Sequence, residues 1–299
     1  MKKTAYCKIN LTLEILGTRR ADGFHDIKSI MHKIPLGDEI ELYVDKASKG
    51  IVFECDSDIC APKENLAFRA AQDYLELYTK NTSLTCGVII KLKKITPSGA
   101  GLGGGSADAA CVLDMLQSLL GGVGDEELLL IAAGLGSDVV FCLDRYTCAL
   151  CTGRGEICES ISHLPSHVSL CVAKPYESLN TKGIYASYDG LFGEDYSKDN
   201  SDKMKYALKI KDVSLIKELV CNDFEPVCIP RLSQIVLLKQ SFLQNGAEFS
   251  LMSGSGSAVY GIFTDDLLCK KCKETLEKQG ECEVFAFTSG DFEKMYKGE

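Results

Sequence analysis

The chain has 299 residues, of which 45% are apolar, and its formal net charge is −9 at pH 7. This length and apolar content suffice for one large domain or two medium-sized domains with ample core. The negative balance and the lack of a long basic run argue against a nucleic-acid or anionic-membrane surface. No window is long and uncharged enough to span a bilayer, and no apolar segment follows the basic N-terminus. We therefore expect a cytoplasmic protein that binds neither nucleic acid nor membrane.

Apolar periodicity and turn signals divide the first half of the chain into strands and helices. Strands are expected at residues 8–16, 39–44, 50–55 and 88–95, with an Asp-Gly turn at 19–23. Helices are expected at residues 65–78, 106–120 and 125–133, the second ending at a Gly-Gly pair. The segment 134–138 is expected to be a loop.

The second half of the chain also contains both strands and helices. Strands are expected at residues 147–152, 167–173 and 283–288, and two apolar runs lie within 249–263. Helices are expected at 212–221, 231–245 and 265–279, and the polar stretch 187–204 is expected to be a surface loop. Because the early strands cluster without helices between them, the pattern predicts an α+β fold and not a regular βαβ array. A domain boundary is expected near residues 150–165.

The fifteen cysteines are an odd number in a long chain, and most have apolar neighbours. This pattern predicts free, buried thiols. Two C-x-x-C pairs are present, Cys148/Cys151 and Cys269/Cys272. A structural zinc site needs four convergent ligands, so we predict no metal site from these pairs.

The segment from Pro97 to Ala110 carries the strongest functional signal. Five of the seven residues from Gly99 to Gly105 are glycine, directly after a predicted strand and before a predicted helix. Such a backbone can curl and leave its N–H groups uncovered, and the following helix directs its positive end to the same place. The segment therefore predicts a phosphate-binding loop.

Two common phosphate-binding folds do not fit this loop. The Gly99, Gly101 and Gly104 spacing matches the dinucleotide fingerprint, but that fold needs a strand after the helix, where this sequence predicts a second helix. A Walker A loop needs Gly-Lys-Ser/Thr, which is missing here. A glycine-rich turn without function stays as an alternative.

The loop resembles the central motif of the galactokinase, homoserine kinase, mevalonate kinase and phosphomevalonate kinase (GHMP) superfamily. Two flanking segments also match, Lys8–Leu11 with Arg20–His25 and the glycine-rich Met252–Ser257. With Gly136–Val139 and Asn222–Pro226, the motifs together resemble the 4-diphosphocytidyl-2-C-methyl-D-erythritol kinase branch. The resemblance runs from residue 5 to about residue 263.

This resemblance implies a two-domain fold. The N-terminal ATP-binding domain, residues 1–155, would be ribosomal S5 domain 2-like, and the C-terminal domain, residues 156–299, ferredoxin-like. The implied reaction moves the γ-phosphoryl group of ATP to the 2-hydroxyl of the methylerythritol moiety in non-mevalonate isoprenoid biosynthesis. Mg²⁺ is expected with ATP, without an assigned protein ligand, and the protein is expected to be a monomer or weak homodimer.

The resemblance also implies roles for individual residues. Asp138 is the candidate base, and Lys8 would lie beside it and steady the anionic charge. Taken alone, Asp138 reads as an N-cap or turn residue and Lys8 as a solvated strand lysine. The ATP-binding candidates are Asn65, Leu66, Lys94, Pro97, Gly99, Gly101, Gly103, Gly104, Gly105 and Ser106. The candidates for the cytidyl substrate are Asn10, Phe24, His25, Thr181 and Tyr185, with Phe24 and Tyr185 stacking on the cytosine.

Several residues depart from the family pattern, among them Phe24 where Tyr is common, and two of the departures concern the phosphate loop and the segment that carries Asp138. Asp108 places a carboxylate beside the phosphate loop and would weaken ATP binding unless it points to the helix flank. Val140 replaces a usual proline after Asp138 and predicts a less stiff loop. Two alternatives stay open. One is a sister kinase of a small alcohol, such as homoserine or mevalonate, and the other is a catalytically impaired nucleotide-binding protein of the same fold.

Overall fold

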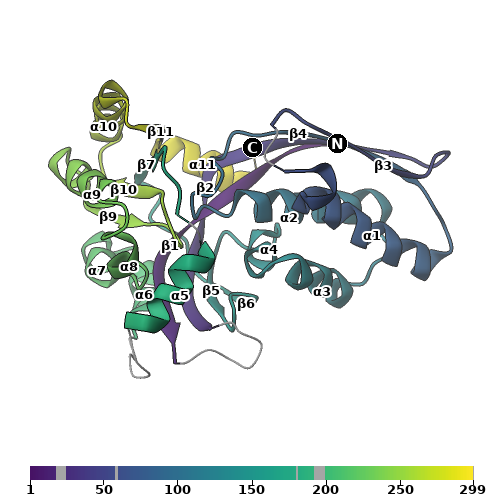
Figure 1. The fold of residues 1–299 in the computed structure, drawn as a ribbon, viewed down its shortest axis with the longest axis horizontal. Helices are drawn as coiled ribbons and strands as arrows, with labels where there is room; N and C mark the ends of the chain where they lie inside the picture. The colour runs from purple at the N-terminus through teal and green to yellow at the C-terminus, as the bar shows by residue number, and fades with distance from the viewer. Residues whose placement is uncertain (18–24, 58–59, 180, 192–198, 299) are drawn as a thin grey trace. The chain divides into compact units, whose positions relative to one another are not determined.

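The computed structural model describes residues 1–17, 25–57, 60–179, 181–191 and 199–298 (Figure 1). Two compact units are present, and the chain passes between them several times. The first contains Met1–Cys7, Leu36–Ser98 and Gly103–Tyr146, and the second contains Lys8–Pro35, Gly99–Leu102 and Thr147–Glu299. The division expected between residues 155 and 156 lies inside the second unit and stays a prediction.

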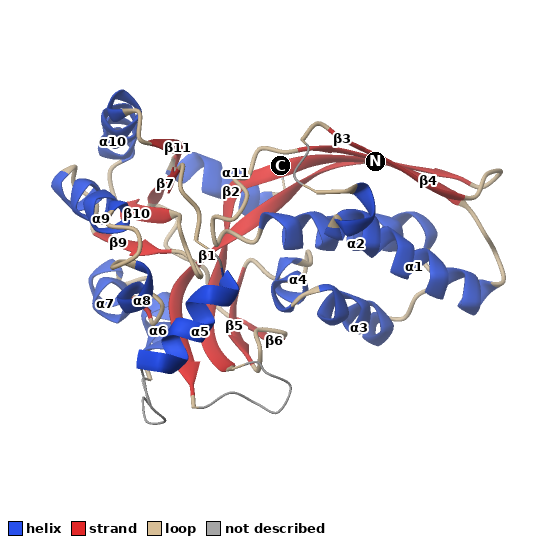
Figure 2. Cartoon of the chain, viewed as in Figure 1, coloured by secondary structure: helices blue, strands red, loops and turns tan. Residues whose placement is uncertain are grey.

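The first unit is a sheet with helices on one side (Figure 2). Its strands are the start of β1 (Lys2–Leu16), the end of β2 (Asp26–Asp45), β3 (Gly50–Cys55) and β4 (Gly87–Lys93). β4 runs antiparallel to β2 and parallel to β3. After the 3₁₀ turn Pro62–Glu64, the helices are α1 (Leu66–Thr82), α2 (Gly104–Leu120), α3 (Asp125–Leu135) and α4 (Ser137–Cys142).

The second unit contains strand pairs around β1 and β2 and a separate antiparallel sheet. β5 (Cys148–Thr152) pairs with the first half of β2 and with β6 (Ile157–Ser160), and β8 (Cys221–Asn222) runs parallel to the end of β1. The antiparallel sheet has the order β11-β7-β10-β9. Its strands are β7 (Ser169–Pro175), β9 (Phe249–Met252), β10 (Val259–Phe263) and β11 (Cys282–Phe287).

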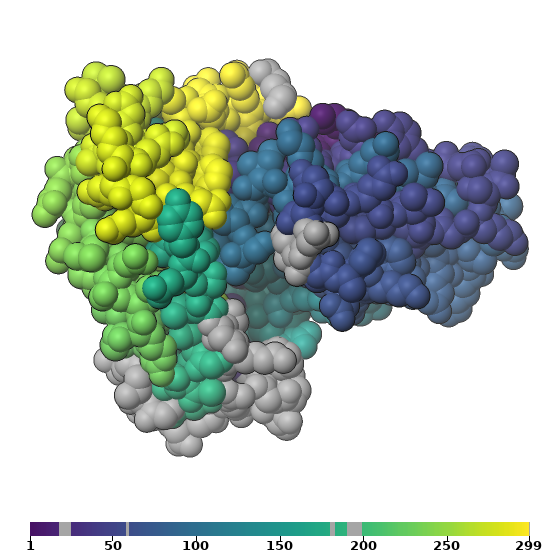
Figure 3. Space-filling model, turned by 45° about the horizontal axis from the view of Figure 1, so that its top comes forward, coloured from purple at the N-terminus to yellow at the C-terminus, as the bar shows by residue number. Residues whose placement is uncertain are grey.

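Helices cover this antiparallel sheet and the strands beside it. α9 and α10 pack on the sheet, and their outer faces lie on the surface (Figure 3). Exposed Leu237, Leu243 and Leu267 belong to these outer faces. The helices of the unit are α5 (Thr181–Leu191), α6 (Asn200–Ile210), α7 (Val213–Leu219), α8 (Glu225–Cys228), α9 (Gln234–Gln244), α10 (Asp266–Gln279) and α11 (Ser289–Lys297). The α+β class predicted from the sequence is therefore confirmed.

The local elements follow the apolar pattern closely where that pattern is regular. β3 has the predicted bounds, and α2 and α3 begin or end within two residues of the predicted positions. β2 is much longer than the predicted strand at 39–44. The prediction missed its first half because that half carries polar residues that are buried in the fold. Among these, Ser29 and His32 are fully buried and hydrogen-bonded, so an alternating pattern is not visible in the sequence.

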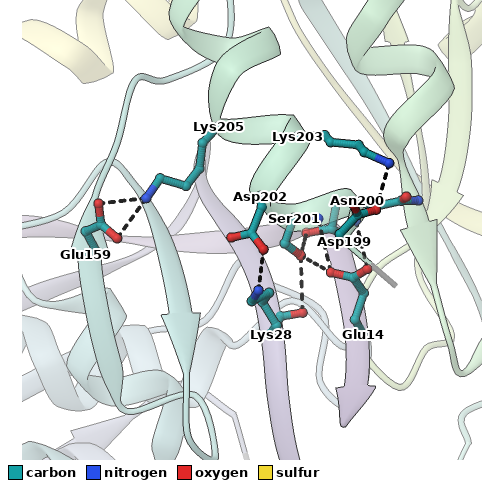
Figure 4. Close-up of polar contacts among 10 residues, drawn as sticks. Glu14, Lys28, Glu159, Asp199, Asn200, Ser201, Asp202, Lys203 and Lys205 are labelled. Carbon is teal, nitrogen blue, oxygen red and sulfur yellow. Dashed lines mark hydrogen bonds and ion pairs between the residues drawn. The ribbon is translucent and has the colours of Figure 1, made fainter. Parts of the chain in front are cut away.

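The prediction of a loop at 134–138 was wrong, because this segment contains the end of α3 and the start of α4. The prediction of a loop at 187–204 was wrong at both ends, which belong to α5 and α6, and residues 192–198 lie outside the described residues. The start of α6 is held by the buried Glu14 of β1 (Figure 4). The Glu14 carboxylate accepts hydrogen bonds from the backbone N–H groups of Asn200 and Ser201, each at 3.0 Å, and from the Ser201 hydroxyl at 2.5 Å. This cap comes from far along the chain, so local composition cannot reveal it.

All fifteen cysteines are free thiols, and eleven of them are buried, as predicted. Burial raises the pKa of most of these thiols, among them the Cys221 thiol, which rises to about 11. In the described part of the chain, no helix combines the length and apolar character needed to cross a membrane.

Candidate functional site

Three segments that are distant in sequence meet around the glycine loop in the second unit. The Lys8 N–H of β1 donates to the Leu102 carbonyl at 2.8 Å, and the Ala258 N–H donates to the Ala100 carbonyl at 3.0 Å. The Ser253 hydroxyl donates to the Gly101 carbonyl at 3.0 Å. Three sequence motifs are therefore joined by direct hydrogen bonds: the first motif is Lys8–Leu11, the second is the glycine loop and the third is Met252–Ser257.

Gly101 is the position where this junction requires glycine. Its φ of 75° lies in the left-handed region. A Cβ atom placed there would lie 2.1 Å from the Ser253 carbonyl oxygen, which no side chain can tolerate. The bare backbone predicted from the sequence thus allows the third motif to pack directly on the loop.

Asn222 extends this network to the Asn222–Pro226 motif. Its side-chain amide donates to the carbonyl oxygens of Met252 and Gly254, both at 2.8 Å. Its Oδ1 accepts from the Phe224 N–H at 2.9 Å. Asn222 is buried, and these hydrogen bonds hold the third motif in place. The sequence contained this motif as a family match but gave no function for Asn222.

In the first unit, the remaining loop glycines open helix α2. The helix begins at Gly104, two residues before the predicted start, and its N-cap is Gly103 with φ of 71°. No side chain caps this end of the helix. Ser106 is half-buried in the first turn. The first N–H groups of α2 are thus left for another acceptor, as a phosphate-binding helix requires.

Asn65 and Leu66 lie at the start of α1 in the same unit. Asn65 is the N-cap of this helix, and its Oδ1 accepts from the Ala67 N–H at 2.9 Å. The half-buried Leu66 directs Cδ1 toward Gly105, at 3.8 Å from the position a Cβ would take there. The structure therefore brings Leu66 to the glycine loop, while Asn65 has a structural capping role.

Lys94 lies just beyond β4 and is held by two buried carboxylates. Its Nζ is 2.5 Å from Oδ2 of Asp38 and 2.7 Å from Oδ2 of Asp108. Asp38 also accepts from the N–H groups of Ile95 and Thr96 through Oδ1. Asp108 therefore points to the helix flank and pairs with Lys94. Pro97 follows this cluster and is half-buried.

The charges in this cluster shift one another's titration. Burial raises the pKa of Asp108 to about 7, against the opposing effect of the Lys94 ammonium. Burial lowers the pKa of Lys94, but the two carboxylates more than offset this effect, so its pKa is raised overall. Lys94 is thus a charged, half-buried residue that links Asp38 of β2 and Asp108 of α2 to the segment after β4.

Lys8 and Asn10 share one face of β1 in the second unit. The Lys8 Nζ donates to Asn10 Oδ1 at 2.8 Å, and both side chains are buried. The Asn10 Nδ2 donates to the Ser29 hydroxyl at 2.8 Å, and that hydroxyl donates to the Thr12 carbonyl at 2.6 Å. Asn10 therefore orients the Lys8 ammonium through a buried chain of hydrogen bonds. A direct contact of Asn10 with substrate stays a prediction.

Asp138 is the second residue of helix α4 in the first unit. It is half-buried and lies in the first turn, where a carboxylate is favoured by the helix dipole. Gly136 is the single residue between α3 and α4. Val140, in the position of the usual proline, is buried inside the same helix.

The predicted substrate residues His25 and Tyr185 lie together in the second unit. Their rings are nearly parallel, with 18° between planes and 6.0 Å between centroids. Tyr185 also meets Phe224 edge-on at 4.6 Å. The His25 Nε2 lies 2.6 Å from Oδ1 of Asp189, a residue that the sequence analysis did not select. Phe24 lies outside the described residues, and Thr181 is the first residue of α5.

Within the described ranges, no group of three or more His, Cys, Asp or Glu side chains is placed to hold a metal ion. Cys269 and Cys272 are one helical turn apart and both buried in α10, so they pack as apolar residues.

Comparisons with known proteins agree with this arrangement of motifs. Residues 65–145 match the GHMP kinases N terminal domain, and residues 204–282 match the GHMP kinases C terminal domain. The chain is 34% identical over 287 residues to 4-diphosphocytidyl-2-C-methyl-D-erythritol kinase of Clostridium botulinum strain Kyoto, covering 95% of this chain and 98% of that protein.

Solved structures show the same relationship. A crystal structure of 4-(cytidine 5'-diphospho)-2C-methyl-D-erythritol kinase superposes with a TM-score of 0.77 and 31% identity, covering 96% of this chain and 98% of the other. The L. major mevalonate kinase has a TM-score of 0.68 at 16% identity, covering 96% and 94% of the two chains, and shows the shared fold. This chain therefore belongs to the 4-diphosphocytidyl-2-C-methyl-D-erythritol kinase family of the GHMP kinases.

Proposed function

We propose that this protein is an ATP-dependent small-molecule kinase that phosphorylates the 2-hydroxyl group of 4-diphosphocytidyl-2-C-methyl-D-erythritol. The observation that carries the proposal is the junction of Lys8, the glycine loop and Ser253 by direct backbone and side-chain hydrogen bonds. This junction holds a buried ammonium on the strand that is bonded to the phosphate loop. The aromatic surface around His25 and Tyr185 would serve the cytidyl group, which homoserine and mevalonate lack.

In the proposed reaction, the 2-hydroxyl oxygen forms a bond to the γ-phosphorus of ATP, and the bond from that phosphorus to the β,γ-bridging oxygen breaks. ADP leaves with the electron pair, and the hydroxyl proton passes to the Asp138 carboxylate. The glycine loop and the first N–H groups of α2 would hold the phosphates. Lys8, oriented by Asn10, would stabilise the negative charge on the transferred group.

Mg²⁺ is proposed to enter with ATP and to neutralise charge on the phosphates. The ion prefers oxygen ligands and often binds through one or two protein groups together with substrate phosphates. The half-buried Ser106 hydroxyl in the first turn of α2 is an oxygen donor of this kind and would bind the ion together with the phosphates.

A substrate panel tests the proposed activity. Purified protein with ATP and Mg²⁺ should release ADP with the cytidyl diphosphate substrate, and phosphorus NMR should show a new phosphate monoester on that substrate. Mevalonate and homoserine should give no ADP above the rate without acceptor. ADP release with homoserine but not with the cytidyl compound would favour the sister kinase, and binding of ATP without any transfer would favour the impaired protein.

An Asp138→Asn variant tests the role of the base. Removal of the carboxylate should lower kcat about 100- to 10,000-fold while the protein still binds ATP, because a positioned base contributes to the transition state. Near-full turnover by this variant would rule out Asp138 as the base.

A further inference from the structure

Cys151 and Cys158 form a thiol pair that the proposed reaction does not use. The two residues are direct partners in the antiparallel pairing of β5 and β6 (Figure 2), and their Sγ atoms lie 3.5 Å apart. Side chains of directly opposite residues lie on the same face of a sheet. At 3.5 Å the two sulfur atoms are in contact, so no other group separates them.

The backbone at this pair has the spacing that a disulfide requires. The Ile161 N–H donates to the Cys148 carbonyl at 3.0 Å, so Cys148 and Ile161 are a hydrogen-bonded pair. Hydrogen-bonded and non-hydrogen-bonded pairs alternate along an antiparallel ladder. Cys151 and Cys158 lie three positions further along and are therefore a non-hydrogen-bonded pair, with Cα atoms about 4.5 Å apart. Disulfides span Cα distances of about 4.4–6.8 Å, so the pair meets this requirement.

The two thiols differ in exposure, which gives each a separate role. Cys158 is half-buried on β6, whereas Cys151 is fully buried on β5. Among the described strands β6 pairs only with β5, so Cys158 lies on an edge strand. A small molecule can therefore react with Cys158 first, and Cys151 is placed to attack the sulfur of the product.

We propose that Cys151 and Cys158 are a reversible thiol–disulfide exchange site for a low-molecular-weight disulfide such as glutathione disulfide. The Cys158 thiolate attacks one sulfur of that disulfide, whose S–S bond breaks, and one small thiolate leaves with the electron pair. Cys151 then loses its proton, attacks the Cys158 sulfur and expels the second small thiolate. Two protein thiols are thus oxidised to one disulfide, and the small disulfide is reduced to two thiols, which take up the two protons from the protein.

The new bond would hold together a hairpin at the edge of the second unit. β6 has only four residues, Ile157–Ser160, and three of them are exposed. Short edge elements of this kind open locally more readily than the core. The turn of the hairpin accepts the Ile27 N–H through the Gly153 carbonyl at 2.7 Å, so it also holds the start of β2. A covalent link between β5 and β6 restrains this local opening.

Peptide mapping tests the bond itself. Folded protein is incubated with glutathione disulfide at about pH 8, near the pKa of an ordinary thiol, and its remaining free thiols are then alkylated. Trypsin cuts after Arg154, between the two cysteines, so the peptides on either side stay joined only if a disulfide links them. We expect the joined peptides from the wild type, and their separation after dithiothreitol. Free thiols at both positions, or glutathione retained on Cys158, would overturn the proposal.

Three variants separate this pair from the other thiols. Cys158→Ser should leave Cys151 free, and Cys151→Ser should stop at the mixed disulfide, with glutathione bound to Cys158. Cys148→Ala is the matched control, because Cys148 lies three residues before Cys151 on β5 and therefore on the opposite face of the sheet. This control should keep the joined peptides. Loss of the link in Cys148→Ala, with the link retained in Cys151→Ser, would assign the bond to Cys148 and refute the proposal.

Hydrogen exchange tests the effect on the hairpin. Backbone amides of β5 and β6 should exchange at least about threefold more slowly in the oxidised wild type than in the reduced protein, because the link opposes local opening. Cys158→Ser treated with the same oxidant should exchange at the rate of the reduced protein. Equal rates in oxidised and reduced wild type would show that the bond does not restrain the hairpin.

Discussion

The buried cluster of Lys94, Asp38 and Asp108 predicts an unusual dependence of stability on pH. Asp108 is 1% exposed, and burial raises its pKa from 3.8 to about 7. The folded protein therefore keeps the Asp108 proton over a range in which the unfolded chain has lost it. Stability from this group is fully present below the unfolded pKa and is lost as the pH rises through the folded pKa.

The size of this effect follows from the two pKa values. Between about pH 5 and pH 8, Asp108 has already lost its proton in the unfolded chain, whereas the folded protein keeps this proton until near pH 7. Each pH unit over which only the folded protein holds the proton lowers the free energy of unfolding by about 1.4 kcal/mol. From pH 5 to pH 8 this loss amounts to about 2.5 kcal/mol. This is a large share of the stability of a typical domain.

An Asp108→Asn variant should lose this dependence. The neutral amide has the shape of the protonated carboxyl group but does not titrate. We expect its free energy of unfolding to change between pH 5 and pH 8 by about 2.5 kcal/mol less than that of the wild type. The assay is urea unfolding at several pH values. Asp125→Asn, at an exposed carboxylate of the same unit, is the control and should follow the wild type.

A specific result would refute this reasoning. If Asp108→Asn and the wild type lose the same free energy of unfolding between pH 5 and pH 8, Asp108 is already charged in the folded protein at pH 5. Lys94 would then outweigh the effect of burial, and the cluster would be an ordinary buried ion pair.

Three further predictions concern the Glu14 cap of α6, Gly101 in the glycine loop and the Lys8 ammonium. Glu14→Gln should lower the free energy of unfolding by about 1–3 kcal/mol in urea unfolding, because three hydrogen bonds to a charged acceptor at the start of α6 are weakened. Gly101→Ala should raise the KM for ATP at least about tenfold, because its Cβ would clash with Ser253; Gly280→Ala, with φ of 69° and open space around the Cβ, should leave that KM unchanged. Lys8→Met should lower kcat about 100- to 1,000-fold with unchanged helix content by circular dichroism, and a kcat near the wild-type value would exclude an electrostatic role.

Much of the candidate site could be predicted from the sequence because its parts are local motifs. The glycine loop needs its bare backbone wherever it occurs, and Lys8 and Asn10 lie on one strand face through simple alternation. Asp189 and Asp38 were not predicted. Nothing adjacent in the sequence distinguishes either carboxylate from a solvated one, and each gains its meaning from a partner that is more than fifty residues away.

The α+β class, most strands and helices, the phosphate loop and the resemblance to the kinase family could all be recognised in the amino-acid sequence. These features depend on local periodicity and on motifs whose chemistry is contained in a few neighbouring residues. The full length of β2, the existence of α6 and the orientation of the Asp108 side chain became visible only in the folded chain. In each case a buried polar group is satisfied by a distant segment: Ser29 by Asn10, the start of α6 by Glu14, and Asp108 by Lys94. Hydrogen bonds and charge pairs of this kind form only when the chain has folded, so local sequence cannot reveal them.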